Sequence, residues 1–284
     1  MITIVDSGST KTVWHFIQSD KCRTVLNTLG MNPNFLAEKD WESIVATIKE
    51  LGVNAEACTK VFFYGAGCGT DEAKSFIAKC LKTVFKSAEL FIDTDLLGAC
   101  RSSNGKSETI VGIMGTGSSS CVYDGEKIVE RLPALGYTLG DEGSGNHIGK
   151  KLIKAYLQNK MPSDLHSRFK ECYPCGVSYF LENLYSKPYP NRFLASFAPF
   201  AKDNIEHPFI VKLLDDVFTA FVEEQIMVYS CHKSCRVYLI GSVAYHFADV
   251  IRSVARRYGL NAIQVAASPM EGLQEFHASD IVRI

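Results

Sequence analysis

Two segments of the chain, one at the N-terminus and one near its middle, repeat a strand, a turn of small residues and a second strand. The first spans residues 2–17 around the turn Asp6–Lys11, and the second spans residues 109–123 around Gly115–Ser119. Apolar and β-branched residues flank both turns, which is typical of β-hairpins. Because a repeated unit indicates duplication, the pattern predicts one domain type built twice, with two turns that could face each other across a cleft.

The residues around each hairpin continue as the same α/β pattern. In the first half we expect strands over residues 2–5, 13–17, 23–28, 61–64 and 90–93, and helices over 41–51, 71–85 and from about 95. In the second half we expect strands over 109–113, 121–123, 127–130 and 236–240, with a largely helical stretch over 142–229. The pattern therefore predicts an N-terminal domain over residues 1–106 and a C-terminal domain over 107–284 with a helical insertion.

Composition excludes several classes of function. The 284 residues correspond to about two domains at a typical length of roughly 150 residues. The 30 Lys and Arg residues nearly balance the 31 Asp and Glu residues, so no excess charge exists to gather nucleic acid or an anionic membrane. No apolar run approaches the roughly 18 residues of a membrane-spanning helix, and the first residues do not resemble a secretion signal. We expect a cytoplasmic protein with reduced cysteines.

The two turns have the composition of loops that bind polyphosphates. Glycine lets backbone N–H groups approach a ligand closely, and hydroxyl side chains add further donors. Neither turn continues into the Gly-Lys-Ser/Thr of a P-loop, and neither has the GxGxxG spacing that opens a helix. A single turn of this kind is usually no more than a hairpin turn, but two at equivalent positions of a repeat favour a nucleotide.

Five short motifs extend this interpretation. They are Asp6–Thr12, Thr94–Ala99, Gly115–Ser118, Gly140–Gly145 and Gly241–Ala244. Together they resemble the superfamily of acetate and sugar kinases, heat-shock chaperones and actin, and within it the N-acetylglucosamine kinases and their activator-ATPase relatives. The resemblance runs from residue 2 to about residue 273. It implies a duplicated ribonuclease H-like, actin-like ATPase fold with two domains around a nucleotide cleft.

The resemblance also implies that ATP and Mg²⁺ are the cofactors. Asp6 resembles the aspartate that holds Mg²⁺ through water, and Asp95 resembles the base that accepts the proton of the sugar hydroxyl. The other nucleotide-binding residues that the phosphate loops and the adenosine-binding turn imply are Ser9, Thr10, Lys11, Gly115, Thr116, Gly117, Ser118, Gly241 and Ser242. A carboxylate of ordinary pKa can act as this base, because a loose transition state makes the attacking hydroxyl acidic late in the transfer.

The sugar-binding residues follow from the same resemblance. The stretch Gly140–Gly145 closely matches that of N-acetylglucosamine kinases, which implies that Asp141, Gly145 and Asn34 join Asp95 in binding the sugar. The implied reaction is phosphorylation of N-acetylglucosamine at its 6-hydroxyl by a homodimeric enzyme, with neither nucleic acid nor membrane as a partner.

One segment departs from the family pattern. Leu135-Gly136-Tyr137 stands where the family has Gly-Trp-Gly-His, near the acetamido group of the sugar. A kinase of another hexose, amino sugar or anhydro-sugar therefore stays open. A regulatory or activator ATPase of the same superfamily is the alternative from a different functional class.

Asp95 also has a purely structural interpretation. A helix is expected to begin just after it, and aspartate is a favoured N-cap residue. The surrounding motif favours the catalytic role instead.

Two cysteine pairs, Cys172/Cys175 and Cys231/Cys235, have spacings at which thiolates can share a metal ion. A long expected helix separates the pairs, and no other cluster of His and Cys accompanies either one. A metal shared by the four cysteines is therefore not expected. His147, which follows Gly145, is interpreted as a structural or pocket-lining residue.

Overall fold

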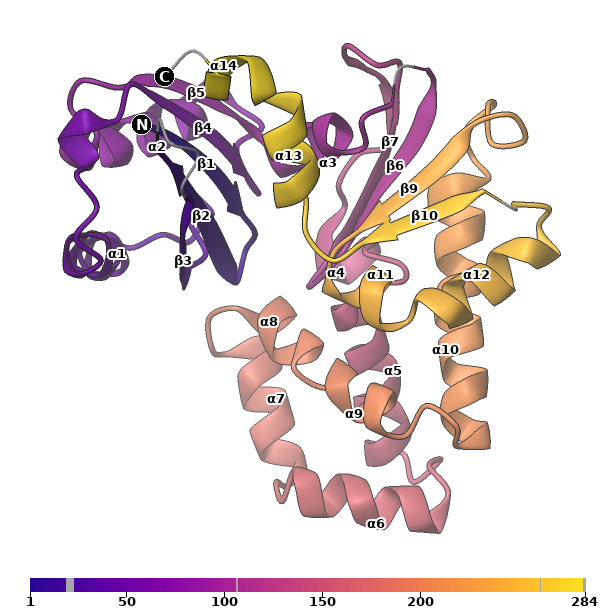
Figure 1. Ribbon diagram of the computed structural model, residues 1–284. Helices are drawn as coiled ribbons and strands as arrows, with labels where there is room; N and C mark the ends of the chain where they lie inside the picture. Colours follow the sequence, from indigo (N-terminus) through magenta and orange to yellow (C-terminus); the bar gives the residue numbers. More distant parts are fainter. Residues whose placement is uncertain (19–22, 106, 261, 283–284) are drawn as a thin grey trace. The chain divides into compact units, whose positions relative to one another are not determined.

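The computed structural model describes residues 1–18, 23–105, 107–260 and 262–282 (Figure 1). The chain forms two compact units. The first combines Met1–Ser107 with Tyr123–Ile128 and Ser268–Ile284, and the second combines Glu108–Val122 with Val129–Ala267. Residue 106, the predicted domain boundary, lies outside the described residues, so that boundary stays a prediction.

The first unit is built on a five-stranded mixed sheet in the order β3-β2-β1-β4-β5. Its strands are β1 (Ile2–Ser7), β2 (Lys11–Ile17), β3 (Arg23–Leu29), β4 (Lys60–Gly65) and β5 (Glu89–Thr94). The first three form an antiparallel meander, whereas β4 and β5 run parallel to β1. The parallel strands end at one edge of the sheet, where Ser7, Gly65 and Thr94 are neighbours in register.

The second sheet repeats this topology. Its strands are β6 (Thr109–Met114), β7 (Ser118–Tyr123), β8 (Ile128–Arg131), β9 (Arg236–Ile240) and β10 (Ile263–Ala266). Their order is β10-β9-β6-β7-β8, and β9 runs parallel to both β6 and β10. Read from the other edge, the second sheet has the order β8-β7-β6-β9-β10, which corresponds strand by strand to β3-β2-β1-β4-β5 in the first sheet. The predicted duplication is therefore confirmed.

Helices cover both faces of the first sheet. They are α1 (Glu38–Glu50), α2 (Asp71–Val84), α3 (Asp95–Ser102), α13 (Met270–Phe276) and α14 (Ala278–Val282), with a 3₁₀ turn at Ala55–Ala57. Alternate strand residues point to opposite faces. Val5 and Phe63 accordingly join the core with α1 and α2, whereas Ile4 joins the core with Met270 and Leu273 of α13. The C-terminal segment thus closes the first unit, which the sequence did not predict.

The second unit carries the predicted helical insertion (Figure 1). Its helices are α4 (Gly136–Leu139), α5 (Gly145–Leu157), α6 (Ser163–Cys172), α7 (Val177–Tyr185), α8 (Pro190–Ala195), α9 (Ala198–Asp203), α10 (Pro208–Phe221), α11 (Ser242–His246) and α12 (Ala248–Arg257), and a π-helical segment at Val222–Ile226 continues α10. Leu214, Val217, Phe218 and Phe221 stand at helical spacing, and all four are buried on one face of α10. Among the described residues, no helix is both long enough and apolar enough to cross a membrane.

Candidate active site

Two predicted site residues lie at the carboxyl end of the first sheet. Asp6 is the penultimate residue of β1, and Asp95 directly follows the last residue of β5. In open α/β sheets, ligands bind at this edge because the turns that follow the strands leave a crevice there. The first unit therefore brings the predicted Mg²⁺-binding residue and the predicted base to the same edge of one parallel set of strands.

The two carboxylates influence each other electrostatically. Burial and, to a smaller extent, the charge of Asp95 raise the pKa of Asp6 to about 7, against the opposing effect of the Lys11 ammonium. A carboxyl group with this pKa holds a proton through part of the neutral range. A cation beside Asp6 would offset the negative charge of this pair of carboxylates.

The N-terminus of α3 fixes the position of Asp95. Thr94 is the N-cap, and its Oγ1 accepts a hydrogen bond from the N–H of Leu97 at 3.1 Å. Asp95 is the first helical residue, and its Oδ1 accepts from the N–H of Leu96 at 2.9 Å. The interpretation of Asp95 as the cap is therefore wrong, because the hydroxyl of the preceding threonine already fills that role.

The first small-residue turn is held by hydroxyl groups from its own hairpin. The Gly8 N–H donates to the Lys11 carbonyl at 2.9 Å, which closes the turn between β1 and β2. The Ser7 Oγ lies 2.8 Å from the Thr12 Oγ1 and accepts a hydrogen bond from the N–H of Met31 at 2.9 Å. Ser7 thus joins the turn to the segment that follows β3.

That segment packs directly on the turn. The Gly30 N–H donates to the Thr10 carbonyl at 3.0 Å, and a Cβ at Gly30 would lie 2.4 Å from the Gly8 carbonyl oxygen. Only glycine permits this approach. Asn32 is buried, and its Nδ2 donates to the Ser9 Oγ at 3.2 Å. Sequence reasoning missed Asn32, although its place two residues after Gly30 could have suggested a side chain that supports the turn.

Asn34, the predicted sugar-binding asparagine, is exposed. Its backbone N–H donates to the Asn32 Oδ1 at 3.0 Å, so Asn32 organises both the turn and the residue predicted to bind sugar. The contact of the Asn34 side chain with a sugar stays a prediction.

In the second unit, Asp141 holds the other small-residue turn. The Gly115 N–H donates to the Gly117 carbonyl at 2.9 Å within the turn. The Ser118 N–H donates to the Asp141 Oδ1 at 3.1 Å, and the Asn146 Nδ2 donates to its Oδ2 at 2.7 Å. Burial raises the pKa of Asp141, while these two hydrogen bonds act in the opposite direction. Each carboxylate oxygen keeps a second lone pair, so Asp141 can still accept a ligand hydroxyl.

The first turn of α5 binds the same loop through its backbone. The Gly145 N–H donates to the Gly115 carbonyl at 2.8 Å, and the Asn146 N–H donates to the Thr116 carbonyl at 3.0 Å. Ser144 caps the helix, accepting a hydrogen bond from the N–H of His147 at 3.3 Å. Gly145, predicted to bind sugar, thus uses its N–H to position the phosphate loop.

Replacing Asn146 with alanine is expected to destabilise the protein by roughly 1–3 kcal/mol, because the change leaves the Asp141 carboxylate with one donor fewer. Asn146 is fully buried, so water cannot easily take its place. Urea unfolding measures the change. Asn183, whose Nδ2 donates a solvent-exposed hydrogen bond to the Tyr179 carbonyl, provides the control Asn183→Ala. Equal stability losses in the two variants would contradict the role of Asn146.

The predicted adenosine-binding turn lies against the phosphate loop. Gly241 follows β9 with a φ of 118°, and a Cβ there would lie 2.5 Å from the Met114 carbonyl oxygen and 3.5 Å from the Gly115 nitrogen. At Gly115 itself, a Cβ would meet no heavy atom of the described residues within 4 Å, so its backbone borders open space. Ser242 begins α11 and is exposed. The second unit thus brings both predicted nucleotide-binding turns together.

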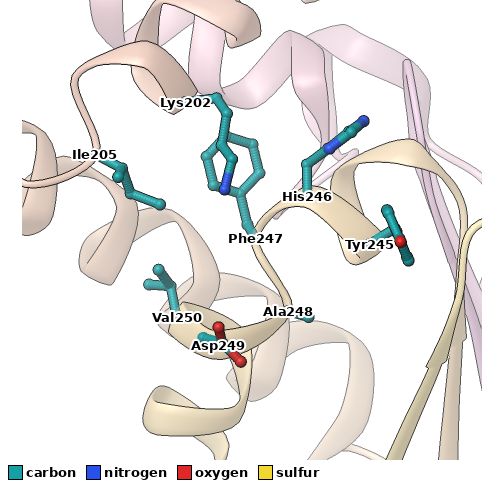
Figure 2. A pocket seen from close by; sticks show the side chains of 8 residues that line it. All are labelled: Lys202, Ile205, Tyr245, His246, Phe247, Ala248, Asp249 and Val250. Carbon is teal, nitrogen blue, oxygen red and sulfur yellow. The ribbon is translucent and has the colours of Figure 1, made fainter.

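A cavity of about 270 Å³ lies further along α11 (Figure 2). Its lining residues are Lys202, Ile205, Tyr245, His246, Phe247, Ala248, Asp249 and Val250. None of the predicted site residues lines it. The cavity therefore begins at the end of α11 opposite Ser242, and the sequence motifs do not account for it.

The interpretation of His147 as a structural residue agrees with its surroundings. Its Nδ1 accepts a hydrogen bond from the Gly143 N–H at 3.2 Å. Burial, together with the smaller effect of the Lys150 and Lys151 charges, lowers the pKa of His147 to about 4. The imidazole is therefore neutral at physiological pH and helps to shape the turn that carries Asp141.

Comparison with known proteins identifies relatives of the chain. Residues 5–207 match the model of the BadF/BadG/BcrA/BcrD ATPase family. The N-acetylmuramic acid/N-acetylglucosamine kinase of Clostridium acetobutylicum is 29% identical over 163 residues, which are 55% of this chain and 53% of that protein. The matched region thus spans about half the length of this curated relative.

Solved structures are similar over nearly the whole chain. A protein of Porphyromonas gingivalis, provisionally named an N-acetylglucosamine kinase, is 36% identical with a TM-score of 0.91 over 99% of both chains. A protein of Chromobacterium violaceum with the same provisional name is 17% identical, with a TM-score of 0.69 over 97% of this chain and 99% of that one. A ROK family glucokinase of Streptomyces griseus, solved with glucose and AMPPNP, is 15% identical with a TM-score of 0.58 over 99% of both chains.

The two more distant structures show the shared fold and confirm the predicted duplicated actin-like ATPase architecture. The family resemblance predicted from the motifs is also confirmed, since the matching family model covers both phosphate loops and the segment around Asp141. The chain belongs to the BadF/BadG/BcrA/BcrD ATPase family.

Proposed function

We propose that this protein is an ATP-dependent sugar kinase that phosphorylates N-acetylglucosamine at its 6-hydroxyl. The observation that carries the proposal is the pair of carboxylates, Asp6 and Asp95, at the carboxyl end of one set of parallel strands beside a small-residue turn. The similarity to the P. gingivalis and C. acetobutylicum proteins supports a sugar as the phosphate acceptor. A cytoplasmic homodimer that uses ATP and Mg²⁺ is part of the same proposal.

In this proposal Asp95 accepts the proton of the sugar hydroxyl. In phosphoryl transfer, the protein mainly positions the reactants, offsets charge on the phosphate oxygens and accepts one proton. The Thr94 cap holds the first turn of α3, and the Leu96 N–H donates a hydrogen bond to the Asp95 Oδ1 at the helix N-terminus. The hydroxyl groups and backbone N–H groups of Ser9–Lys11 and Gly115–Ser118 are the proposed donors to the phosphates.

The residues at the end of β1 fit a magnesium ion. Mg²⁺ prefers oxygen ligands and is usually held through one or two carboxylates and several waters. Asp6 is a partly buried carboxyl group that the charge of a second carboxylate, Asp95, acts on, so the pair offers the oxygen ligands that a cation would stabilise. Asp6 would hold the ion, which when bound offsets the charge of the phosphate oxygens. The open space beside Gly115 likewise fits a phosphate group that approaches the backbone.

A panel of sugars tests the proposal. ADP release with N-acetylglucosamine, N-acetylmuramic acid, an anhydro-sugar and glucose is expected to depend on the sugar, with the highest kcat/KM for N-acetylglucosamine. A pocket that binds the acetamido group is expected to favour it over glucose by roughly 10-fold or more. A higher kcat/KM for another sugar would show that N-acetylglucosamine is not the preferred substrate, while the assignment as a sugar kinase would still hold. ATP hydrolysis that no sugar stimulates would favour the regulatory ATPase instead.

A further inference from the structure

A cluster of metal-binding side chains lies at the amino end of the second sheet. Among the described residues, Glu108, Cys231 and Cys235 form a group whose ligand atoms all lie within 4.8 Å of one another. The Cys235 Sγ lies 3.7 Å from the Glu108 Oε2. The two cysteines are partly buried and the glutamate is exposed, so the cluster can be reached from solvent.

The sheet register brings Glu108 next to Cys235. β6 and β9 are parallel neighbours in which Thr109 pairs with Arg236, so the residues that precede these two are also side by side. Glu108 precedes β6, whereas Gly115 follows it, so the cluster and the proposed phosphate loop lie at opposite ends of this strand.

A tight turn brings the second cysteine to the same place. The Cys231 carbonyl accepts hydrogen bonds from the backbone N–H groups of Ser234 and Cys235, both at 2.9 Å. This closes a helical turn, in which residues four apart are neighbours on one face. Tyr229, fully buried with its hydroxyl 2.9 Å from the Ser120 Oγ, anchors the start of the segment. The thiol pair is thus held by a packed residue and does not depend on the metal for its position.

We propose that Glu108, Cys231 and Cys235 form a zinc-binding site that joins the amino ends of β6 and β9. The donor set of two thiolates and one carboxylate suits Zn²⁺, with water as the fourth ligand. In a tetrahedral zinc site, a sulfur and an oxygen ligand lie roughly 3.6 Å apart, given the usual bond lengths. The observed distance of 3.7 Å between the Cys235 Sγ and the Glu108 Oε2 matches this ligand-to-ligand distance. Binding displaces the thiol protons to solvent.

The site differs from the one that the cysteine spacing first suggests. Cys172 and Cys175 are not part of this group, and the third ligand comes from a glutamate far away in the sequence. The position of the cluster predicts a structural role. Zinc is expected to stabilise the second unit, and its removal should leave the residues around Gly115 in place.

Cobalt titration of the full-length, reduced, metal-free protein tests the proposal. We expect one Co²⁺ per chain, a thiolate-to-cobalt charge-transfer absorption, and displacement of the Co²⁺ by Zn²⁺. Cys235→Ser and Cys231→Ser should each lose this absorption, and Glu108→Gln should weaken metal binding by at least about 10-fold. Cys172→Ser is the matched control, since it removes an exposed thiol from the other cysteine pair.

Circular dichroism without metal shows whether each variant folds, so a loss of binding can be assigned to the missing ligand. Three results would overturn the proposal. They are no charge-transfer absorption in the wild-type protein, absorption that survives Cys235→Ser, and equal Co²⁺ affinity in Glu108→Gln and the wild-type protein.

Discussion

Asp95→Asn is expected to lower kcat by roughly 10² or more while leaving the affinity for ATP and sugar nearly unchanged. Asparagine has almost the same shape as aspartate, and its side-chain oxygen can still accept the hydrogen bond from Leu96. Because Thr94 caps α3, the helix does not depend on the carboxylate. The amide cannot take up the proton of the sugar hydroxyl, so the loss should fall on the chemical step.

Asp93→Asn is the matched control for this prediction. Asp93 lies two residues earlier at the end of β5 and pairs with Lys74 at 3.1 Å. Its replacement is expected to change kcat only slightly. Steady-state turnover is measured together with sugar affinity in both variants. Near wild-type turnover in Asp95→Asn would leave the chemistry without its proposed base.

Asp6→Asn is expected to make the metal-free protein more stable at pH 8 and to remove most of its Mg²⁺-dependent activity. The pKa of Asp6 is about 7 in the folded protein, against an ordinary value of 3.8 for an aspartate. Between these values the folded state holds a proton that the unfolded state releases, so the wild-type protein loses stability as the pH rises from about 4 to about 7. At about 1.4 kcal/mol per pKa unit, the loss is at most about 4 kcal/mol. Asparagine does not titrate and avoids this loss.

Thermal unfolding of the metal-free protein at pH 5 and pH 8 measures the effect. The difference in stability between Asp6→Asn and wild type should be larger at pH 8 than at pH 5. Asp249→Asn, which changes a solvent-exposed carboxylate, should not alter the pH dependence. Turnover of Asp6→Asn should fall by roughly 10² at saturating ATP, because the ligand proposed to hold Mg²⁺ is lost. An unchanged Mg²⁺ titration would contradict the proposed role of Asp6.

The fold could be predicted from local sequence patterns to a large extent. Short runs of apolar and β-branched residues in the first half predicted β1 to β5, and apolar residues at helical spacing predicted the helices between them. The repeat of the hairpin predicted the duplicated topology. Helix α13 was not predicted, since its packing on the first unit depends on contacts with Ile4 that are far apart in the sequence. The spacing of apolar residues within a segment does not predict such long-range contacts.

The candidate site was predictable to the extent that its residues lie in short motifs. Asp6 and Asp95 could be named because the motifs around them, Asp6–Thr12 and Thr94–Ala99, resemble those of a known superfamily. Asn32 and Asn146 were missed, since both act by supporting another residue through a hydrogen bond that only the folded chain forms. Glu108 was missed for a similar reason, because its proximity to Cys235 follows from the register of two strands.

Product analysis distinguishes a sugar kinase from an ATPase in a single reaction. The protein is incubated with ATP, Mg²⁺ and N-acetylglucosamine, and ADP, inorganic phosphate and sugar phosphate are quantified by ³¹P NMR. Each ADP is expected to be matched by one molecule of N-acetylglucosamine phosphorylated at the 6-hydroxyl, with little inorganic phosphate. ADP matched by inorganic phosphate, with no sugar phosphate formed, would rule out the proposed sugar kinase.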